Sequence, residues 1–244
     1  MTKYTDEMVQ KRRVGMLWNP LEVKDSFKPR NLKVRKATVK EVRYYVSNFH
    51  YSRSTPDSTK ECFIGSYEDG NIAGVILYGM GTNHAQYTYL IDDIKKGEYR
   101  ELTRLWSPDG MPRNTESRLI AESLKMLPSK VKLVVSYADP SQKHLGIIYQ
   151  ATNWHYCDMS GSGNMIIDED GKTVHARLIG IYKLRHPDTF GKMTNKEIME
   201  KKGWKYINSA SKHRYAMFLG DKRQKKKMLK KIKDKIKPYP KTLT

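Results

Sequence analysis

The chain has 244 residues, which is enough for one large domain or two small ones. Hydrophobic residues make up 38% of it, so a sizeable core is possible, and no apolar run is long enough to predict a transmembrane span. The formal net charge is +20, which predicts a polyanionic partner: DNA, RNA or an anionic membrane surface. The N-terminus lacks the apolar segment of a signal peptide, and two cysteines support neither a disulfide framework nor a four-ligand zinc site. We therefore expect a soluble intracellular protein in which Cys62 and Cys157 are small buried side chains.

The first predicted unit is a strand followed by a helix. Residues 1–27 precede it, and we expect them to form a loosely structured arm that docks through Met16, Leu17 and Trp18. Residues 32–36 alternate like a short strand, and Thr38 and Glu41 form a capping box that opens a helix. The apolar positions of this helix are Val42, Tyr45, Val46 and Phe49.

A hairpin and further sheet segments follow. Residues 62–67 and 72–78 resemble strands, and Asp69-Gly70 between them is a strong hairpin signal. Residues 87–91 are expected to continue the sheet. Residues 99–106 alternate, with Leu102 and Arg104 on one face and Glu101, Thr103 and Leu105 on the other. Asn114 or Thr115 then caps a helix over residues 116–127.

The most informative stretch is a strand, a turn and a helix between residues 131 and 152. Residues 131–137 are apolar and rich in β-branched side chains, which predicts a buried strand that stops at Pro140. Residues 142–152 have the apolar spacing of a helix. Strand ends that open onto helix N-termini are where α/β proteins bind ligands, and the free N–H groups there attract anions. This turn is therefore a predicted ligand site.

The remaining elements complete a mixed, mostly antiparallel sheet with few helices. Strands are expected over residues 153–157, 174–184, 204–207 and 213–219, a loop over residues 160–172, and a capped helix between Thr194 and Gly203. The segment from residue 221 onward has eleven Lys or Arg and two Asp, and Met228, Ile232 and Ile236 have the spacing of an amphipathic helix. We therefore expect an arm (1–27), an α/β catalytic domain (28–220) and a basic C-terminal extension (221–244).

Several residues near these turns have side chains suited to chemistry. His50 and Tyr51 follow the first helix in a polar loop and suit general acid–base catalysis, although a loop histidine without a role is the alternative. Asp139 ends the most apolar strand, where a partly desolvated carboxylate can serve as a base or a metal ligand; the alternative is that it only caps the next helix. A phosphate or pyrophosphate would suit the turn, which offers N–H groups, a lysine and a glycine. The predicted cofactor-binding residues are Ser141, Gln142, Lys143, His144 and Gly146.

A block of residues around this turn carries a family resemblance. It consists of Asp139-Pro140-Ser141-Gln142, His144, Gly146, Ile148-Tyr149-Gln150-Ala151 and Asn153-Trp154. Further pieces, in the same order along the chain, are His50-Tyr51-Ser52-Arg53, Glu101-Leu102-Thr103-Arg104-Leu105, Asn114-Thr115-Glu116-Ser117 and Lys212-His213-Arg214-Tyr215. Together they resemble the Mom family of bacteriophage DNA-modification proteins, and the resemblance covers most of the chain.

The resemblance implies a GNAT-like fold, that of the acyl-CoA N-acyltransferases, with a mixed, largely antiparallel sheet flanked by helices. It also implies an enzyme that converts adenine in DNA to an N6-carbamoylmethyl derivative and so protects DNA from restriction enzymes. Acetyl-CoA or a related acyl donor is the implied cofactor, although the loop is one residue longer than the GNAT pattern and lacks its second glycine. The family positions implicated in activity are His50, Tyr51, Asp139 and Tyr149. An iron requirement is also implied, with Asp139 and Tyr149 as candidate oxygen ligands.

The implied partner is double-stranded DNA rather than a membrane. Adenine N6 is paired inside a duplex, so the target base must be unpaired or flipped. Tyr51, Trp106 and Trp154 are candidates to stack on it, with core packing as the alternative for the two tryptophans. Lysines contact phosphates without reading bases. The predicted DNA-binding residues are Arg53, Arg104, Trp106, Asn153, Trp154, Lys225, Lys226 and Lys227.

The sequence thus predicts a phage DNA-modification transferase in the host cell cytoplasm, with either His50 or Asp139 as the base. One alternative is a GNAT-like acyltransferase that acts on another nucleic-acid or protein amine. The other is a non-catalytic, basic DNA- or RNA-binding protein.

Overall fold

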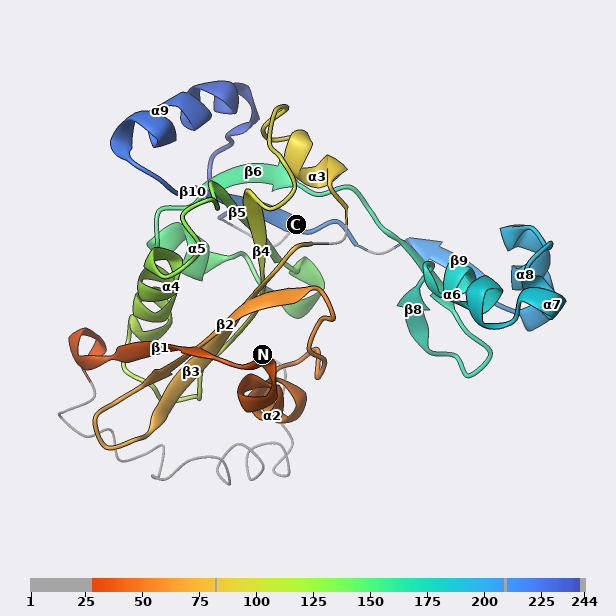
Figure 1. Cartoon of the computed structure of the whole chain (residues 1–244), viewed down its shortest axis with the longest axis horizontal. Helices are drawn as coiled ribbons and strands as arrows, with labels where there is room; N and C mark the ends of the chain where they lie inside the picture. Colours follow the sequence, from red (N-terminus) through yellow and green to blue (C-terminus); the bar gives the residue numbers. More distant parts are fainter. Residues whose placement is uncertain (1–27, 82, 209, 242–244) are drawn as a thin grey trace.

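A seven-stranded sheet forms the centre of the protein, whose computed structural model describes residues 28–81, 83–208 and 210–241 (Figure 1). Its strands, in spatial order, are β1 (Lys33–Ala37), β2 (Thr59–Ser66), β3 (Ile72–Gly79), β4 (Tyr99–Trp106), β5 (Leu133–Ala138), β10 (His213–Phe218) and β6 (His155–Met159). Neighbouring strands are antiparallel except β4 and β5, which are parallel. The predicted mixed, largely antiparallel α/β fold is confirmed.

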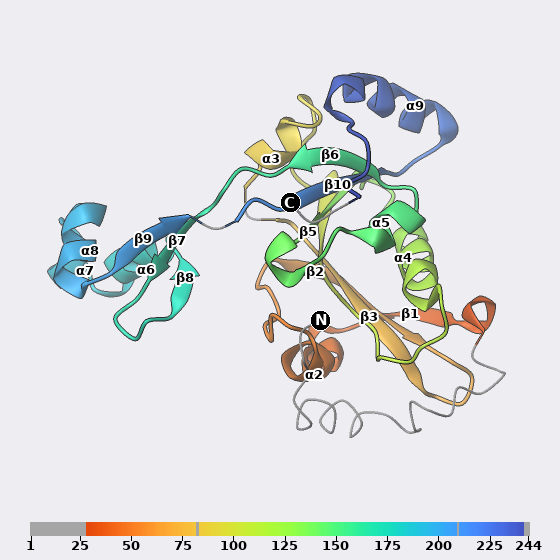
Figure 2. The same ribbon diagram turned by 180° about the vertical axis from the view of Figure 1, so that it is seen from behind.

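Helices cover both faces of this sheet (Figure 2). On one face lie α4 (Thr115–Lys125) and α5 (Ile147–Ala151), which pack through Leu119, Ile120 and Tyr149. On the opposite face, α2 (Val39–Phe49) covers β2 to β4, while α3 (Ala85–Thr88) and α9 (Lys222–Lys231) cover the other half. Short 3-10 turns are η1 (Pro29–Asn31), η2 (Pro140–Gln142) and η3 (Lys233–Lys235).

Local sequence signals located several elements correctly. Thr38 and Glu41 form the predicted capping box of α2, and the side chain of Thr38 accepts a hydrogen bond from the Glu41 N–H. Gly70 has φ +82° in the turn between β2 and β3, as the hairpin signal predicts. Met228 and Ile232 are buried under α9, and Cys62 and Cys157 are free and buried. These predictions are confirmed, and the capping box and the hairpin turn could be located because each depends on neighbouring residues only.

A separate lobe follows β6 and projects from the main body (Figure 1). Its sheet has the order β8-β7-β9, formed by β7 (Asn164–Ile167), β8 (Thr173–His175) and β9 (Lys205–Asn208). Three helices complete it: α6 (Leu178–Arg185), α7 (Pro187–Phe190) and α8 (Asn195–Lys202). Ile166, Ile179 and Trp204 lie in its own hydrophobic core. The predicted strand over residues 174–184 is wrong, because the β8 ladder ends after three residues and the chain turns into α6.

Three other predicted elements differ from the structure. The predicted loop over residues 160–172 contains β7, because these residues pair with both β8 and β9. Residues 87–91 do not extend the sheet, because the chain forms α3 and a turn that brings Tyr87 into the core. The predicted helix over residues 142–152 is only α5, because Lys143 (φ 58°) and Gly146 (φ 75°) are left-handed and interrupt it.

The division into a domain over residues 28–220 and an extension from 221 stays a prediction, and α9 packs on the main sheet. The predicted arm at 1–27 lies outside the described residues. Within the part of the chain that is described, no helix is both long and apolar enough to cross a membrane.

Candidate active site

A cleft opens where β4 and β5 separate. The two strands pair only from Tyr99 with Leu133 to Leu102 with Ser136, and both continue beyond that point. A cavity of about 320 Å³ lies there, lined by both strands, by α5 and by the segments that follow α2 and β5. The turn that the sequence singled out therefore forms one wall of a cavity.

A β-bulge in β4 accompanies this opening. Leu77 of β3 pairs with Arg104, and the next residue, Tyr78, pairs with Leu102, so Thr103 has no partner in the ladder. Leu102 consequently faces α4 and α5, whereas Arg104 reaches the loop that follows α2. The prediction that Leu102 and Arg104 share a face is wrong, because a bulge shifts the alternation by one residue.

A second cavity of about 220 Å³ adjoins the first. The residues that line both cavities are His50, Tyr51, Leu105, Glu116 and His144. The larger cavity extends to α5, and the smaller one extends to Trp106 and the loop after β4. Two molecules bound one in each cavity would meet at the five shared residues.

His50 is only 8% exposed and is held by its own loop. Its Nδ1 accepts a hydrogen bond from the Ser52 N–H at 3.1 Å and lies 2.9 Å from the Ser52 hydroxyl oxygen. Because Nδ1 is an acceptor, the neutral imidazole carries its proton on Nε2. Burial, and then the proximity of Arg104 and His144, lowers the pKa of His50 to about 4. At neutral pH this side chain is therefore uncharged and donates from Nε2.

Arg104 fastens the loop that carries His50 and Tyr51 to the sheet. Its Nε donates to the Ser54 carbonyl oxygen at 2.9 Å, and its Nη1 donates to the Thr103 carbonyl oxygen at 2.7 Å. The Tyr51 ring centroid lies 4.4 Å from that of His50, and the ring of His144 meets Tyr51 edge-on at 5.9 Å. Tyr51 is 55% exposed, so a ligand in the cleft can reach it.

Tyr149 is buried and lines the larger cavity. Its hydroxyl oxygen lies 2.7 Å from Ser136 Oγ, which lies 3.0 Å from the Leu102 carbonyl oxygen. Burial, opposed by this hydrogen bond, raises the pKa of Tyr149 to about 12. The phenol is therefore protonated at neutral pH, and its hydroxyl bridges β5 and α5 where the cleft begins.

Asp139 lies just outside the cavity lining, and both of its oxygens have partners. Oδ1 accepts from the Ser141 N–H at 3.0 Å and from the Ser141 hydroxyl at 2.6 Å, while Oδ2 is 2.9 Å from Lys212 Nζ. Burial disfavours the charged carboxylate, but the bonds from Ser141 and Lys212 outweigh it and lower the pKa of Asp139. This geometry matches the capping role that the sequence offered as the alternative.

The N–H groups of the predicted cofactor loop fall into two sets. Those of residues 141–144 bond within the turn, to Asp139 or Pro140, so they are not free for an anion as predicted. Those of residues 145–148 donate to no group among the described residues, and all four residues line the larger cavity. The N–H groups available to a ligand therefore lie further along the chain, because Asp139 and Pro140 accept the hydrogen bonds of those at the start of the turn.

Gly146 lets this part of the turn pack against β10. It has φ +75°, and a Cβ atom there would lie 2.4 Å from Cε2 of Tyr215. The Tyr215 hydroxyl donates to the carbonyl oxygen of Leu145, and the Gln150 amide donates to the Tyr215 hydroxyl at 3.1 Å. Only glycine satisfies both the backbone conformation and the close approach.

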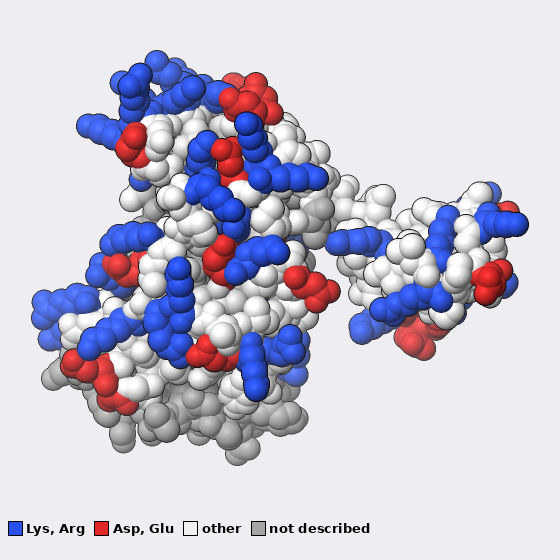
Figure 3. Space-filling view, viewed as in Figure 1, with Lys and Arg blue, Asp and Glu red and all other residues white. Residues whose placement is uncertain are grey.

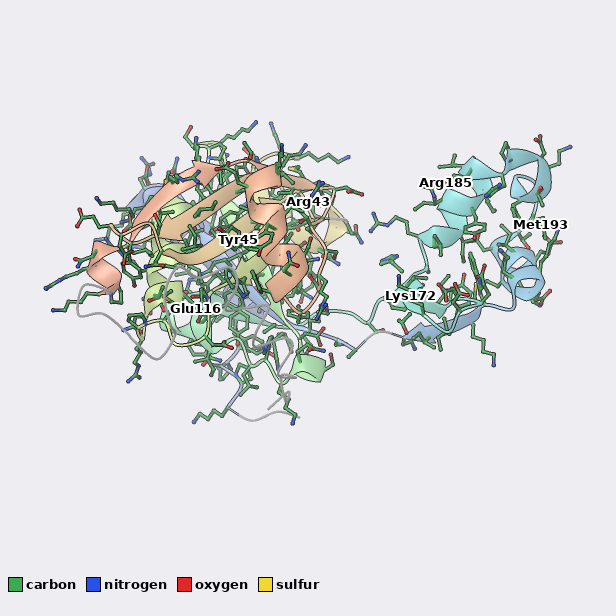
Figure 4. All side chains as sticks on the ribbon, turned by 90° about the horizontal axis from the view of Figure 1, so that it is seen from below. Arg43, Tyr45, Glu116, Lys172, Arg185 and Met193 are labelled. Carbon is green, nitrogen blue, oxygen red and sulfur yellow. The ribbon has the colours of Figure 1, made fainter. Side chains whose placement is uncertain are left out.

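Two glutamates near the cleft were missed by sequence reasoning. Glu116, in the first turn of α4, lines both cavities, and Figure 4 marks it on the main body. Although the residue is exposed overall, the cavity walls desolvate its carboxyl group and raise the pKa of Glu116. Burial also raises the pKa of Glu101 in β4, which accepts a hydrogen bond from the Tyr87 hydroxyl at 3.0 Å. Both glutamates belong to segments that carry the family resemblance, and this was the signal in the sequence that could have identified them.

The residues predicted to contact DNA have very different surroundings. Trp154 is fully buried against Tyr149, so its predicted stacking on a base is wrong in this structure and core packing is the correct alternative. Trp106 is 6% exposed and stacks on Phe49 with ring centroids 5.1 Å apart, while it also lines the smaller cavity. Arg53 is exposed, and the exposed Asn153 has φ 60° at the end of α5, where asparagine is common.

The three predicted DNA-binding lysines, Lys225, Lys226 and Lys227, are exposed on α9. This helix packs beside Glu98 and Lys132, the residues that precede β4 and β5. The cleft lies at the other end of the same two strands. Figure 3 shows Lys and Arg side chains gathered over the region of α9.

The residues implied as iron ligands do not fit that role. The Asp139 oxygens are occupied by Ser141 and Lys212, and the Tyr149 hydroxyl is bonded to Ser136. Over residues 28–81, 83–208 and 210–241, no three His, Cys, Asp or Glu side chains converge as metal ligands would.

Fold and site together define a mixed α/β protein whose sheet divides at its parallel strand pair to form a ligand cleft. The sequence profile of the Mom protein family matches residues 31–241, a span that contains every residue of the cleft. The chain therefore belongs to the Mom family. It is 30% identical over 203 residues to the methylcarbamoylase Mom of Escherichia phage Mu. This alignment covers 82% of this chain and 79% of the phage Mu protein.

Solved structures with lower similarity were also found. An N-acetyltransferase from Staphylococcus aureus Mu50 is 12% identical, with a TM-score of 0.41, and covers 78% of this chain and 99% of its own. A GNAT family N-acetyltransferase from Escherichia coli, in complex with CoA, is 9% identical, with a TM-score of 0.34, and covers 51% of this chain and 68% of its own. The assignment of the chain rests on the family match and not on these alignments.

Proposed function

We propose that the protein is a GNAT-like, phage-type DNA-modification enzyme that converts adenine to its N6-carbamoylmethyl derivative and thereby protects DNA from restriction. The observation that carries this proposal is membership of the Mom family together with the phage Mu relative, which is named a methylcarbamoylase. A two-part cleft, with four free N–H groups in one part, supports an enzyme that joins a donor and an acceptor.

The larger cavity is the proposed donor site. The N–H groups of residues 145–148 and the side chain of Lys143 suit the phosphates of acetyl-CoA or a related donor. His144 and Gly146 belong to the same wall, whereas Ser141 and Gln142 act by holding the turn. If such a donor binds there, its phosphates would neutralise part of the positive charge beside the cleft.

The transferred group limits what the donor can be. An acetyl group would bond to N6 through its carbonyl carbon, whereas a carbamoylmethyl group bonds through a methylene carbon and contains one more nitrogen. A simple acetyl-CoA transfer would therefore give a product of different mass. The donor for the proposed product must present an electrophilic carbon that becomes this methylene.

The residues proposed to support the reaction are His50, Tyr51, Asp139 and Tyr149; the first two and Tyr149 line the cleft, whereas Asp139 is a positioning residue. His50 and Tyr149 each carry a proton at neutral pH, so they suit hydrogen bonding to the donor or protonation of its leaving group. Tyr51 is exposed beside them and suits stacking on the base. Asp139 supports the reaction indirectly, because it holds Lys212 and the start of the turn.

Double-stranded DNA is the proposed partner, in the cytoplasm of the host cell. Adenine must leave the duplex for N6 to enter the cleft. The smaller cavity, with Trp106 as one wall, is the proposed place for the base, and Arg53 and Arg104 belong to the adjoining loop and strand. Lys225, Lys226 and Lys227 would contact phosphates of the same duplex further away.

Mass spectrometry of nucleosides tests this proposal. DNA from cells that express the protein should contain a carbamoylmethyl deoxyadenosine that is absent from control cells and resists restriction. An acetylated nucleoside, or an adduct on RNA or protein instead, would replace the proposal with an acyltransferase acting on another amine. DNA binding with no adduct on any of these would favour the non-catalytic alternative.

A further inference from the structure

Transfer to any amine requires a group that accepts a proton. The amine nitrogen forms a bond to the donor carbon, the bond from that carbon to its leaving group breaks, and the leaving group takes the electron pair. One amine proton is released in the same step. A side chain that takes this proton directly must lie where donor and acceptor meet, which here is the wall shared by the two cavities.

His50 belongs to that wall but is in the wrong state to accept a proton. Its Nδ1 already accepts the Ser52 N–H, so Nε2 carries the hydrogen of the neutral ring. To act as a base, the ring would have to lose this bond and shift its proton. The arrangement suits a hydrogen-bond donor instead.

Asp139 is also unsuited, for two reasons. It is not part of either cavity lining, and its oxygens are bonded to Ser141 and Lys212. Protonation would break the ion pair with Lys212 and leave that ammonium beside a neutral carboxyl group. Both side chains that the sequence offered as the base are therefore disfavoured by their contacts.

We propose that Glu116 is the catalytic base that takes the proton from the acceptor amine, an inference that rests on the proposed transfer reaction. Glu116 is the one carboxylate that lines both cavities, and it makes no hydrogen bond or ion pair with any residue in the described part of the chain. Its oxygens are thus free to meet an amine at the junction. The raised pKa of this carboxyl group supports the role, because it brings the base closer to neutral pH.

The fold also fixes the backbone that carries Glu116. Thr115, the residue before it, is buried, and its hydroxyl donates to the Pro112 carbonyl oxygen at 2.7 Å and lies 3.2 Å from the Tyr67 hydroxyl oxygen. The first turn of α4 is therefore anchored on both sides. A base held in this way keeps its position when a substrate enters.

The test compares Glu116→Gln with Glu116→Asp and with a matched control on the same helix, Glu122→Gln. Glu122 forms ion pairs with Arg118 and Lys125, so its change removes one charge from α4 without touching the cleft. We expect Glu116→Gln to lower kcat about 10²–10⁴-fold with DNA affinity unchanged, the usual contribution of a general base. Glu116→Asp should restore part of the rate, and Glu122→Gln should leave it unchanged.

The pH profile separates a base from a residue that merely shapes the cleft. The titratable groups that face Glu116 are His50, Tyr51, Asp109, Tyr137, Lys143, His144 and Tyr149. In the wild type, kcat/KM should fall as the pH drops through the pKa of Glu116. The residual activity of Glu116→Gln should lack this acid limb.

His144 is the rival that could overturn the assignment, because it also lines both cavities. If His144→Asn abolishes the rate and the acid limb while Glu116→Gln keeps them, His144 is the base and the proposal is wrong. If the wild type modifies RNA or protein rather than adenine, the proposed function fails, but the same variants decide the role of Glu116 on that acceptor. A wild type that transfers nothing to any amine refutes both.

Discussion

The titratable groups at the two ends of β4 and β5 have very different surroundings. At the end where the strands separate, His50, Glu116 and Tyr149 are desolvated enough to shift their pKa values, and each occupies a defined place in the cleft. At the end where the strands begin, Lys225, Lys226 and Lys227 are exposed on one helix. The two regions are separated by about 17 Å along β5, given its six residues.

This difference predicts how each region responds to change. In the cleft, a substitution alters hydrogen bonds of buried groups that water cannot reach to replace. The effects should therefore be large and local. On α9, water and salt screen each charge, so effects should be small, additive and dependent on ionic strength. Variants of the two regions should therefore differ in size and in salt dependence.

After the Glu116 variants, the largest effect is expected at Gly146. Gly146→Val places a Cβ against the Tyr215 ring at a left-handed φ, so the wall of the larger cavity must move. A displacement of about 1 Å in such a site can reduce activity about 10²-fold. Nucleoside analysis and thermal unfolding would measure the loss. Gly161→Val is the matched control, because no atom lies within 4 Å of its Cβ position, and equal losses in both variants would contradict the close contact.

The next effect is a dependence of stability on pH that comes from His50. The folded pKa of about 4 lies below the ordinary value of 6.5, so between these pH values the unfolded chain binds the proton more readily. Neutral His50 therefore makes its full contribution to the free energy of unfolding above pH 6.5. This contribution, of roughly 3 kcal/mol at most, is lost as the pH falls towards 4.

His50→Gln removes this titration. Denaturant unfolding at several pH values in this range would give, for wild type and variant, the slope of the unfolding free energy against pH. The difference between the two slopes removes the contribution of the other histidines, which is the same in both proteins. Parallel curves would show that His50 is not held in its neutral form.

The sequence located some parts of this cleft and could not locate others. Residues 131–137 predicted β5 because a run of apolar, β-branched residues marks a buried strand without reference to its partners. The bulge at Thr103 was missed, because it exists only through the pairing of β4 with β3. Glu116 was missed because α4 and the turn after β5 meet only in the folded chain. The short α5 was overestimated, since its apolar spacing concealed the left-handed Lys143 and Gly146.

A smaller effect is expected from Ser136, whose hydroxyl oxygen lies near both Tyr149 and Leu102. Ser136→Ala leaves the buried Tyr149 hydroxyl without its partner, at a cost of about 1–3 kcal/mol in the free energy of unfolding. Ser123→Ala is the control, because Ser123 is paired with the buried Tyr78 hydroxyl at 2.8 Å, away from the cleft. Both variants should lose similar stability, but only Ser136→Ala should lower kcat. Equal kcat values would mean that the Tyr149 hydroxyl has no part in the reaction.

The smallest effect is expected on α9. Replacement of Lys225, Lys226 and Lys227 by Ala should weaken DNA binding most at low salt and reduce the slope of log K against log salt by about 0.9 for each phosphate that is no longer neutralised. The rate at saturating DNA should not change, because these side chains lie at the end of the strands away from the cleft. Fluorescence anisotropy over a salt series would measure the slope.

The matched control for α9 removes three other exposed lysines, Lys36, Lys40 and Lys60, which belong to β1, α2 and β2; β1 and β2 lie at the edge of the sheet away from β10 and β6. If both triple variants change the slope equally, net charge alone attracts the DNA, and α9 makes no specific contact with the duplex. If only the α9 variant changes it, the duplex runs along α9 while its flipped base occupies the cleft. In that case the two ends of β4 and β5 act on one substrate, one through screened attraction and the other through chemistry at a fixed position.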